Sequence, residues 1–133
     1  MKPTESELEI LQILWQSGGE LTVRAINDRL NERRAIGYTT TLKMMQIMLE
    51  KGLLARRDDE RQHFFRPANA PSSTQGVLIS NLVQNAFSGS AAQLVMQALG
   101  NHTASAAELD EIKKLIQSIE NLHQSGGQEQ VKP

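Results

Sequence analysis

The sequence contains no cysteine and only five aromatic residues among 133 positions. Without thiols, the chain has no disulfide, thiolate metal site or cysteine nucleophile, which fits a reducing compartment. No apolar run approaches the ~20 residues that a membrane-spanning helix needs, and no segment resembles a signal peptide. We therefore expect a soluble, cytoplasmic protein that does not insert into a membrane.

The few aromatic residues are unevenly distributed along the chain. Four of them lie in the first 70 residues and only Phe87 lies beyond, so only the first part can build a conventional core. We predict a compact domain over residues 1–70 and a helical region over residues 71–124. Residues 125–133 are polar and glycine-bearing, and we predict that they form a disordered tail.

Positive charge is concentrated in one segment, although the net charge of the chain is only −1. Residues 24–66 hold ten Lys/Arg against six Asp/Glu, a local net charge of +4, and both flanking segments are acidic. Such a concentration is typical of a localised anion-binding face, not of a protein that coats nucleic acid indiscriminately.

Patterns typical of catalysis and metal binding are missing from the sequence. His63, His102 and His123 are far apart, and none stands in a spacing such as H-x-x-x-H. No Ser/His/Asp arrangement has a recognisable context, and no glycine-rich loop follows a strand. We expect no enzyme activity, no metal site and no cofactor.

Two helices are predicted at the start of the chain. Thr4 and Glu7 form a capping box that opens a helix running to about Gln16. Thr22 caps a second helix over about residues 23–31. Both carry apolar residues at the spacing of one helical face, so both should pack on a common core.

A third helix is predicted to begin at Thr39 or Thr40 and to end at Lys51. Its polar residues are spaced by four, three and four, so they share one face, and its other faces are apolar. Lys43 and Gln46 can donate to phosphates or base edges, which favours a helix that reads DNA. The alternative is a core helix whose polar stripe is ordinary solvated surface. The stripe consists of Thr39, Lys43, Gln46 and Glu50, and the anchoring residues are Thr41, Met44, Met45 and Met48.

After this helix the pattern favours a β-hairpin over residues 53–57 and 62–66. The connection Asp58-Asp59-Glu60-Arg61 is short and polar, and Pro67 closes the second strand. Three helices followed by a hairpin are the element order of a winged helix-turn-helix, in which the third helix enters the major groove and the hairpin, or wing, lies along the backbone. The expected fold class is mainly α: a winged helix-turn-helix domain followed by a small all-helical dimerisation region.

The second region begins with a predicted linker over residues 68–74. Helices follow over about 75–87, 91–99 and 106–123. Ser90 and Ser105 are the expected N-caps, the second with Glu108 as a capping box, and Gly100 is the expected stop of the middle helix.

Apolar stripes on these helices need a partner surface. Three short helices with one phenylalanine cannot bury them well within a single chain, so we predict a two-fold symmetric homodimer. Folding back onto the first domain is the alternative. The predicted dimerisation residues are Leu78, Leu82, Leu109, Ile112, Ile116 and Ile119.

Several motifs together resemble the penicillinase and methicillin-resistance repressor family, which includes copper-responsive repressors. They are ELEILQILW (7–15), YTTT (38–41), KGLL (51–54) and the closing Arg66-Pro67. The resemblance covers about residues 4–68 and implies a bacterial transcriptional repressor that binds a palindromic DNA operator as a homodimer. By the resemblance, the groove-facing residues are Tyr38, Thr39, Thr40, Lys43 and Gln46, and the wing residues that meet phosphates are Arg56, Arg57, Arg61 and His63.

The sequence departs from the family in three places. The acids Asp58, Asp59 and Glu60 at the wing tip would repel a phosphate. A membrane sensor protease is a partner that the resemblance implies, but the expected Asn-Phe cleavage position reads Gln97-Ala98. Lacking cysteine, the chain cannot sense copper as the copper-responsive members do. A winged-helix module that binds another protein without touching DNA remains the alternative function.

Overall fold

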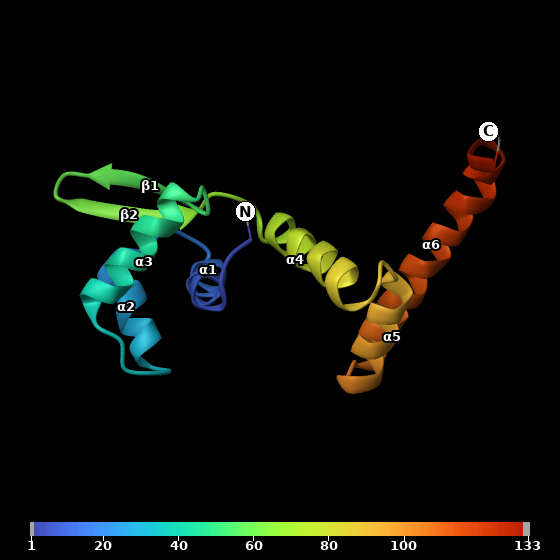
Figure 1. Ribbon diagram of the computed structural model, residues 1–133, viewed down its shortest axis with the longest axis horizontal. Helices are drawn as coiled ribbons and strands as arrows, with labels where there is room; N and C mark the ends of the chain where they lie inside the picture. The colour runs from blue at the N-terminus through green and yellow to red at the C-terminus, as the bar shows by residue number, and fades with distance from the viewer. Residues whose placement is uncertain (1, 132–133) are drawn as a thin grey trace. The chain divides into compact units, whose positions relative to one another are not determined.

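The computed structural model describes residues 2–131, and these residues form six helices and one two-stranded antiparallel sheet. The chain divides into two compact units, Met1–Leu82 and Val83–Pro133. Figure 1 shows the element order. The elements are α1 (Glu5–Ser17), α2 (Val23–Asn31), α3 (Tyr38–Glu50), β1 (Leu54–Asp59), β2 (Gln62–Pro67), α4 (Pro71–Ala86), α5 (Ala91–Asn101) and α6 (Ala106–Val131).

The predicted starts of α1 and α2 are confirmed. The Glu7 N–H donates to Thr4 Oγ1 at 3.2 Å, and the Thr4 N–H donates to Glu7 Oε1 at 2.9 Å, which completes the capping box. Gly18 ends α1 with a φ of 72°, a left-handed conformation that favours glycine. Thr22 Oγ1 accepts from the Ala25 N–H at 3.2 Å and caps α2.

The start of α3 differs from the prediction. The helix begins at Tyr38, before both threonines, and its N-cap is Gly37, which has no side chain to make a capping hydrogen bond. The Gly37 carbonyl accepts from the Thr41 N–H at 3.1 Å and closes the first turn. Because an N-cap needs only extended backbone geometry, the threonine hydroxyls are not required as caps. Thr39 and Thr40 are instead exposed within the first turn.

The hairpin is confirmed, but its connection is shorter than predicted. Asp58 pairs with His63 and Asp59 pairs with Gln62, so both aspartates lie within β1. Only Glu60 and Arg61 form the turn, and Glu60 has a φ of 54°. The wing tip therefore carries one acidic residue instead of the three that the sequence predicts.

One core holds α1, α2, α3 and the hairpin together. Leu21, before α2, exchanges two backbone hydrogen bonds with Phe65 in β2, at 2.9 and 3.0 Å, so the hairpin is attached to the helices. Burial of these apolar side chains is the main stabilising term. This arrangement confirms the mainly α, winged-helix fold class. The fully buried side chains are Ile10, Leu11, Leu14, Ile26, Leu30, Thr41, Met45 and Met48.

The later helices are longer than predicted. α4 begins at Pro71, inside the predicted linker, because proline suits the first turn of a helix, where its missing N–H has no partner to lose. α5 continues through Gly100 to Asn101, so glycine does not stop it. α6 reaches Val131, so residues 125–131 are helical where the sequence predicts disorder. Residues 132–133 of the predicted tail lie outside the described residues.

The predicted N-caps of α5 and α6 are confirmed. The Gln93 N–H donates to Ser90 Oγ at 3.2 Å. The Glu108 N–H donates to Ser105 Oγ at 3.1 Å, and the Ser105 N–H donates to Glu108 Oε1 at 3.0 Å. Both hydrogen bonds of this capping box lower the pKa of Glu108, because they favour its charged form.

Candidate nucleic-acid interface

Buried amide hydrogen bonds fix α3 against α2. Asn27 Nδ2 donates to Thr41 Oγ1 at 2.7 Å and to the Ile36 carbonyl at 3.2 Å. Asn27 is 8% exposed and Thr41 is 0% exposed, so neither group exchanges freely with water. Asn31 braces the same turn by donating to the Ile36 carbonyl and accepting from the Ile36 N–H. The turn between the two helices is therefore held by side chains on α2.

An ion pair fixes the other end of α3. Lys51 Nζ lies 2.8 and 2.9 Å from the two carboxylate oxygens of Glu7, which is 5% exposed. Burial alone raises the pKa of Glu7, but hydrogen bonds from Lys51 and the Thr4 N–H outweigh it, so this pKa lies below its usual value. With both ends fixed, α3 presents one defined face to solvent.

That face carries the polar residues predicted from the sequence. Thr39, Thr40, Lys43 and Gln46 are exposed, whereas Thr41, Met45 and Met48 face the core as predicted and Met44 is half-buried. Among the residues that the structure describes, Lys43 forms no ion pair. Ile47, four residues after Lys43, is an exposed apolar side chain on the same surface, and the sequence analysis did not include it. Such a side chain can contact a thymine methyl group.

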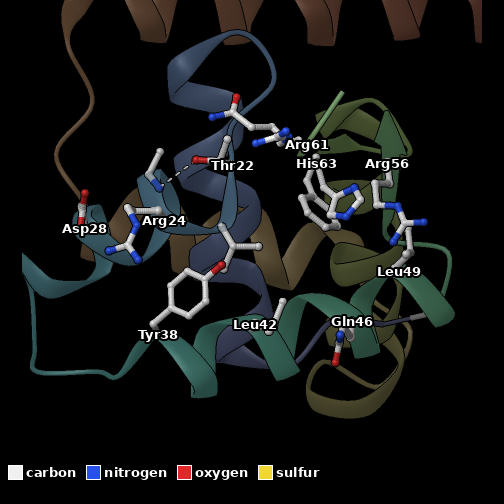
Figure 2. Close-up of a pocket in the computed structure, with 14 residues that line it drawn as sticks. Thr22, Arg24, Asp28, Tyr38, Leu42, Gln46, Leu49, Arg56, Arg61 and His63 are labelled. Carbon is white, nitrogen blue, oxygen red and sulfur yellow. Dashed lines mark hydrogen bonds between the residues drawn. The ribbon is translucent and has the colours of Figure 1, made fainter. Parts of the chain in front are cut away.

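A groove of about 680 Å³ lies between the first turn of α2, α3 and the wing. Figure 2 shows the side chains that line it. The groove brings together five predicted DNA-binding residues: Tyr38, Gln46, Arg56, Arg61 and His63. It does not include four others: Thr39, Thr40, Lys43 and Arg57.

The structure adds Arg24 to the candidate residues. Arg24 lies in the first turn of α2 and lines the groove, with its Cζ 5.1 Å from the centre of the Tyr38 ring. A guanidinium over an aromatic face keeps its N–H groups at the edge, where they can still donate. Sequence reasoning missed this residue because Arg24 and Tyr38 lie on different helices. The only sequence signal was its place within the basic segment.

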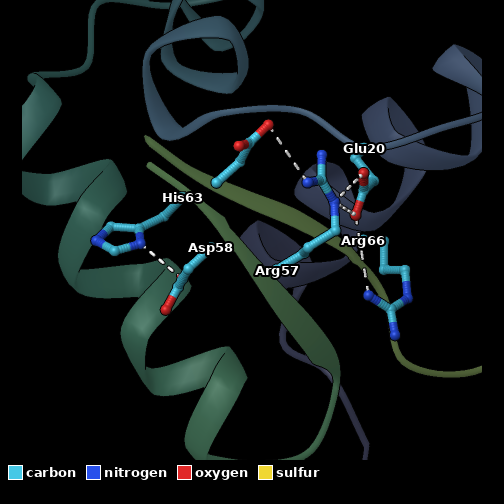
Figure 3. Close-up of polar contacts among 6 residues, drawn as sticks. Glu20, Arg57, Asp58, His63 and Arg66 are labelled. Carbon is cyan, nitrogen blue, oxygen red and sulfur yellow. Dashed lines mark hydrogen bonds and ion pairs between the residues drawn. The ribbon is translucent and has the colours of Figure 1, made fainter. Parts of the chain in front are cut away.

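Two predicted wing residues share a carboxylate of the protein itself. Arg56 Nε lies 3.0 Å from Asp58 Oδ1, and His63 Nδ1 lies 2.7 Å from the same oxygen. Figure 3 shows the His63 contact. The Asp58 carboxylate therefore has both a guanidinium and an imidazole as partners within the hairpin.

Arg57 is held by a second set of acids (Figure 3). Its Nε donates to both oxygens of Glu20 at 2.9 and 3.1 Å, and its Nη1 lies 3.6 Å from Asp59. Hydrogen bonding to Glu20 raises the pKa of Arg57 further. The guanidinium also lies over the Phe64 ring, 4.8 Å from its centre. A contact within a network of charges has better-defined geometry than an isolated surface pair.

The predicted dimerisation residues are partly or largely exposed. Leu82, Leu109, Ile116 and Ile119 are exposed, and Leu78 and Ile112 are half-buried. Further exposed apolar side chains along these helices are Val77, Ile79, Val95, Met96, Leu99, Leu115 and Leu122.

Two other kinds of feature are absent from the described residues. No group of three or more histidine, aspartate or glutamate side chains is placed there to hold a metal ion. Within the same residues, no helix has both the length and the apolar character needed to span a membrane.

Three helices, a wing and an exposed polar face on the third helix define a winged-helix protein of the DNA-binding class. The family model of the penicillinase repressor matches residues 3–118, and the chain belongs to this family of transcriptional repressors. It is similar to the transcriptional regulator BlaI of two Mycobacterium tuberculosis strains, CDC 1551 / Oshkosh and ATCC 25618 / H37Rv. Identity to each is 25% over 118 residues, which cover 88% of this chain and 84% of the relative. The family resemblance is thus confirmed.

Proposed function

We propose that the protein is a sequence-specific repressor that binds a palindromic DNA operator as a homodimer. The observation that carries this proposal is the two-sided character of α3. Its back is buried through Thr41, Met45 and Met48, and its front exposes Lys43 and Gln46. A helix held rigidly in this way can present fixed donors to base edges in the major groove.

The surroundings of α3 support binding to a polyanion. The adjacent groove carries Arg24 and Arg61, neither of which is paired with an acid among the described side chains, and the acid on its lining is Asp28. The first turn of α2 also lines the groove, and N–H groups at a helix start favour a phosphate. Base-reading side chains and phosphate-binding groups are therefore neighbours on one unit.

Dimerisation is supported by the exposed apolar residues of α4 and α6. Ile116 and Ile119 are 49% and 44% exposed, and burial of such side chains against a second copy is favourable. A two-fold dimer would place two copies of α3 against half-sites about one helical turn of DNA apart. We propose that this repressor is cytoplasmic, because the DNA operator that it would bind lies in that compartment.

A membrane sensor protease is the partner that the family resemblance adds to this proposal. The bond between Gln97 and Ala98 lies within α5. Its cleavage would require local unfolding of that helix.

Binding to duplex DNA as a function of salt concentration tests the proposal. A protein that neutralises several phosphates loses affinity steeply, with a log–log slope of about −0.9 for each phosphate. We expect a steep negative slope. Absence of binding at low salt, or a flat slope, would favour the alternative of a winged-helix module that binds another protein.

A further inference from the structure

The basic residues around the groove fall into two groups according to their partners. Arg56, Arg57 and His63 each contact a carboxylate of the protein. Among the described side chains of residues 2–125, Arg24 and Arg61 form no ion pair, although both line the groove. A prediction based on charge alone treats all five residues alike, but their environments differ.

We propose that Arg24 and Arg61 are the two residues that bind the DNA backbone across the groove, and that Arg56, Arg57 and His63 contribute little to phosphate binding. This inference rests on the proposed function, because it assigns the phosphate contacts of the same interface.

Arg24 is held over the start of α3. Its guanidinium lies over Tyr38, the first residue of α3, so the side chain bridges the starts of two helices. The stack restricts the side chain, and less conformational freedom remains to be lost on binding. Residues of the first turn of α2 line the same wall of the groove, and the N–H groups of that turn that Thr22 does not cap can bind the same phosphate.

Arg61 lies on the opposite wall of the groove. Arg61 is the second residue of the two-residue turn between β1 and β2. Asp58 and Asp59 lie in β1, where they contact Arg56 and Arg57. The acid that remains beside Arg61 in the turn is therefore Glu60. Arg61 lines the groove from the wing, so a strand lying in the groove meets a cation on each side.

A paired arginine must give up its carboxylate before it can bind a phosphate. Arg57 would have to leave both oxygens of Glu20, and the freed carboxylate would then lie near the approaching phosphate. An arginine that exchanges its carboxylate partner for a phosphate also leaves that carboxylate unneutralised, so the net charge brought to the DNA changes little. Condensed counterions are released only when a protein adds positive charge at the backbone. Paired arginines therefore contribute little to the salt dependence.

The test measures salt-dependent binding of the full-length chain to a duplex of about 30 base pairs, long enough for two half-sites one turn apart. Because phosphate contacts are independent of sequence, a duplex of arbitrary sequence serves as the probe. Arg24→Ala and Arg61→Ala should each reduce the magnitude of the slope by about 0.9 per bound subunit. A fourfold rise in salt should then weaken each variant about 3.5-fold less than the wild type, per subunit.

Controls separate charge from structure. Arg57→Ala should leave the slope unchanged, and so should Arg29→Ala, which removes an exposed charge from α2 outside the groove. Arg61→Lys should restore the wild-type slope, because it restores the positive charge. Circular dichroism should show that every variant is folded.

Two different results would overturn the inference, and only the second would also overturn the proposed function. If the wild type shows a steep slope that Arg57→Ala lowers while Arg24→Ala and Arg61→Ala do not, the assignment of contacts is wrong and the proposed function stands. If the wild type itself shows no binding or a flat slope, the proposed function fails and the inference fails with it.

Discussion

Replacing Asn27 by alanine should destabilise the first unit strongly. The side chain makes two hydrogen bonds from Nδ2, at 2.7 Å to Thr41 Oγ1 and at 3.2 Å to the Ile36 carbonyl. Its loss leaves the fully buried Thr41 hydroxyl without this partner. Leaving a buried polar group unsatisfied costs about 1–3 kcal/mol, and the better helix propensity of alanine returns roughly 0.5 kcal/mol. We expect a net loss of about 0.5–2.5 kcal/mol in the free energy of unfolding.

Urea unfolding followed by tryptophan fluorescence measures this loss. Trp15 is the single tryptophan of the chain, and it packs against the core of the first unit, so its emission reports on that unit. Asp28→Ala, at the exposed neighbouring position on the same helix, is the matched control and should stay within about 0.5 kcal/mol of the wild type. The reasoning is refuted if Asn27→Ala is as stable as this control.

Three further predictions concern pH, assembly and proteolysis. Because its pKa is lowered in the folded state, Glu7 should contribute stability above its unfolded pKa of about 4.3 and lose it as pH falls through the folded pKa. Glu7→Gln should therefore be less stable than the wild type by about 1.5–3 kcal/mol at pH 7. This difference in the free energy of unfolding should disappear at acid pH, and a difference that persists there would contradict the prediction. In sedimentation experiments, Ile116→Asp should be a monomer and the control Gln117→Asp should remain a dimer. A monomeric wild type would favour the alternative in which the helices fold back onto the first domain. A dimeric Ile116→Asp would mean that the interface lies elsewhere. Limited proteolysis of the folded protein should first cut between helices, at residues 87–90 or 102–105. Mass spectrometry identifies the first cut. A first cut at Gln97-Ala98 would contradict the protection expected inside α5.

Local features of the fold were predictable from the sequence. The capping box of Thr4 and Glu7 involves residues three positions apart, so its signal is contained in one short segment. The buried and exposed faces of α3 follow in the same way from helical periodicity. Boundaries were less predictable where backbone geometry alone decides them, as at Gly37 and Pro71.

Contacts between distant segments were not predictable. Glu20 and Arg57 are 37 residues apart, and nothing in either local sequence indicates that the glutamate binds the wing arginine. The stack of Arg24 on Tyr38 likewise depends on the packing of α2 against α3. The sequence therefore identified the basic segment correctly but could not distinguish paired cations from unpaired ones. That distinction changes the expected phosphate contacts.

If the exposed face of α3 reads DNA sequence, recognition of the operator should depend on Lys43. Fragments selected by the wild type from the source genome would supply an operator, and affinities would be compared for this fragment and a scrambled duplex of equal composition. We expect the wild type to prefer the selected fragment, and folded Lys43→Ala to lose roughly 5- to 150-fold of that preference, the worth of one base contact of about 1–3 kcal/mol. Glu50→Ala, at the far end of the same face, should retain it. A folded Lys43→Ala that keeps the full preference would contradict the account.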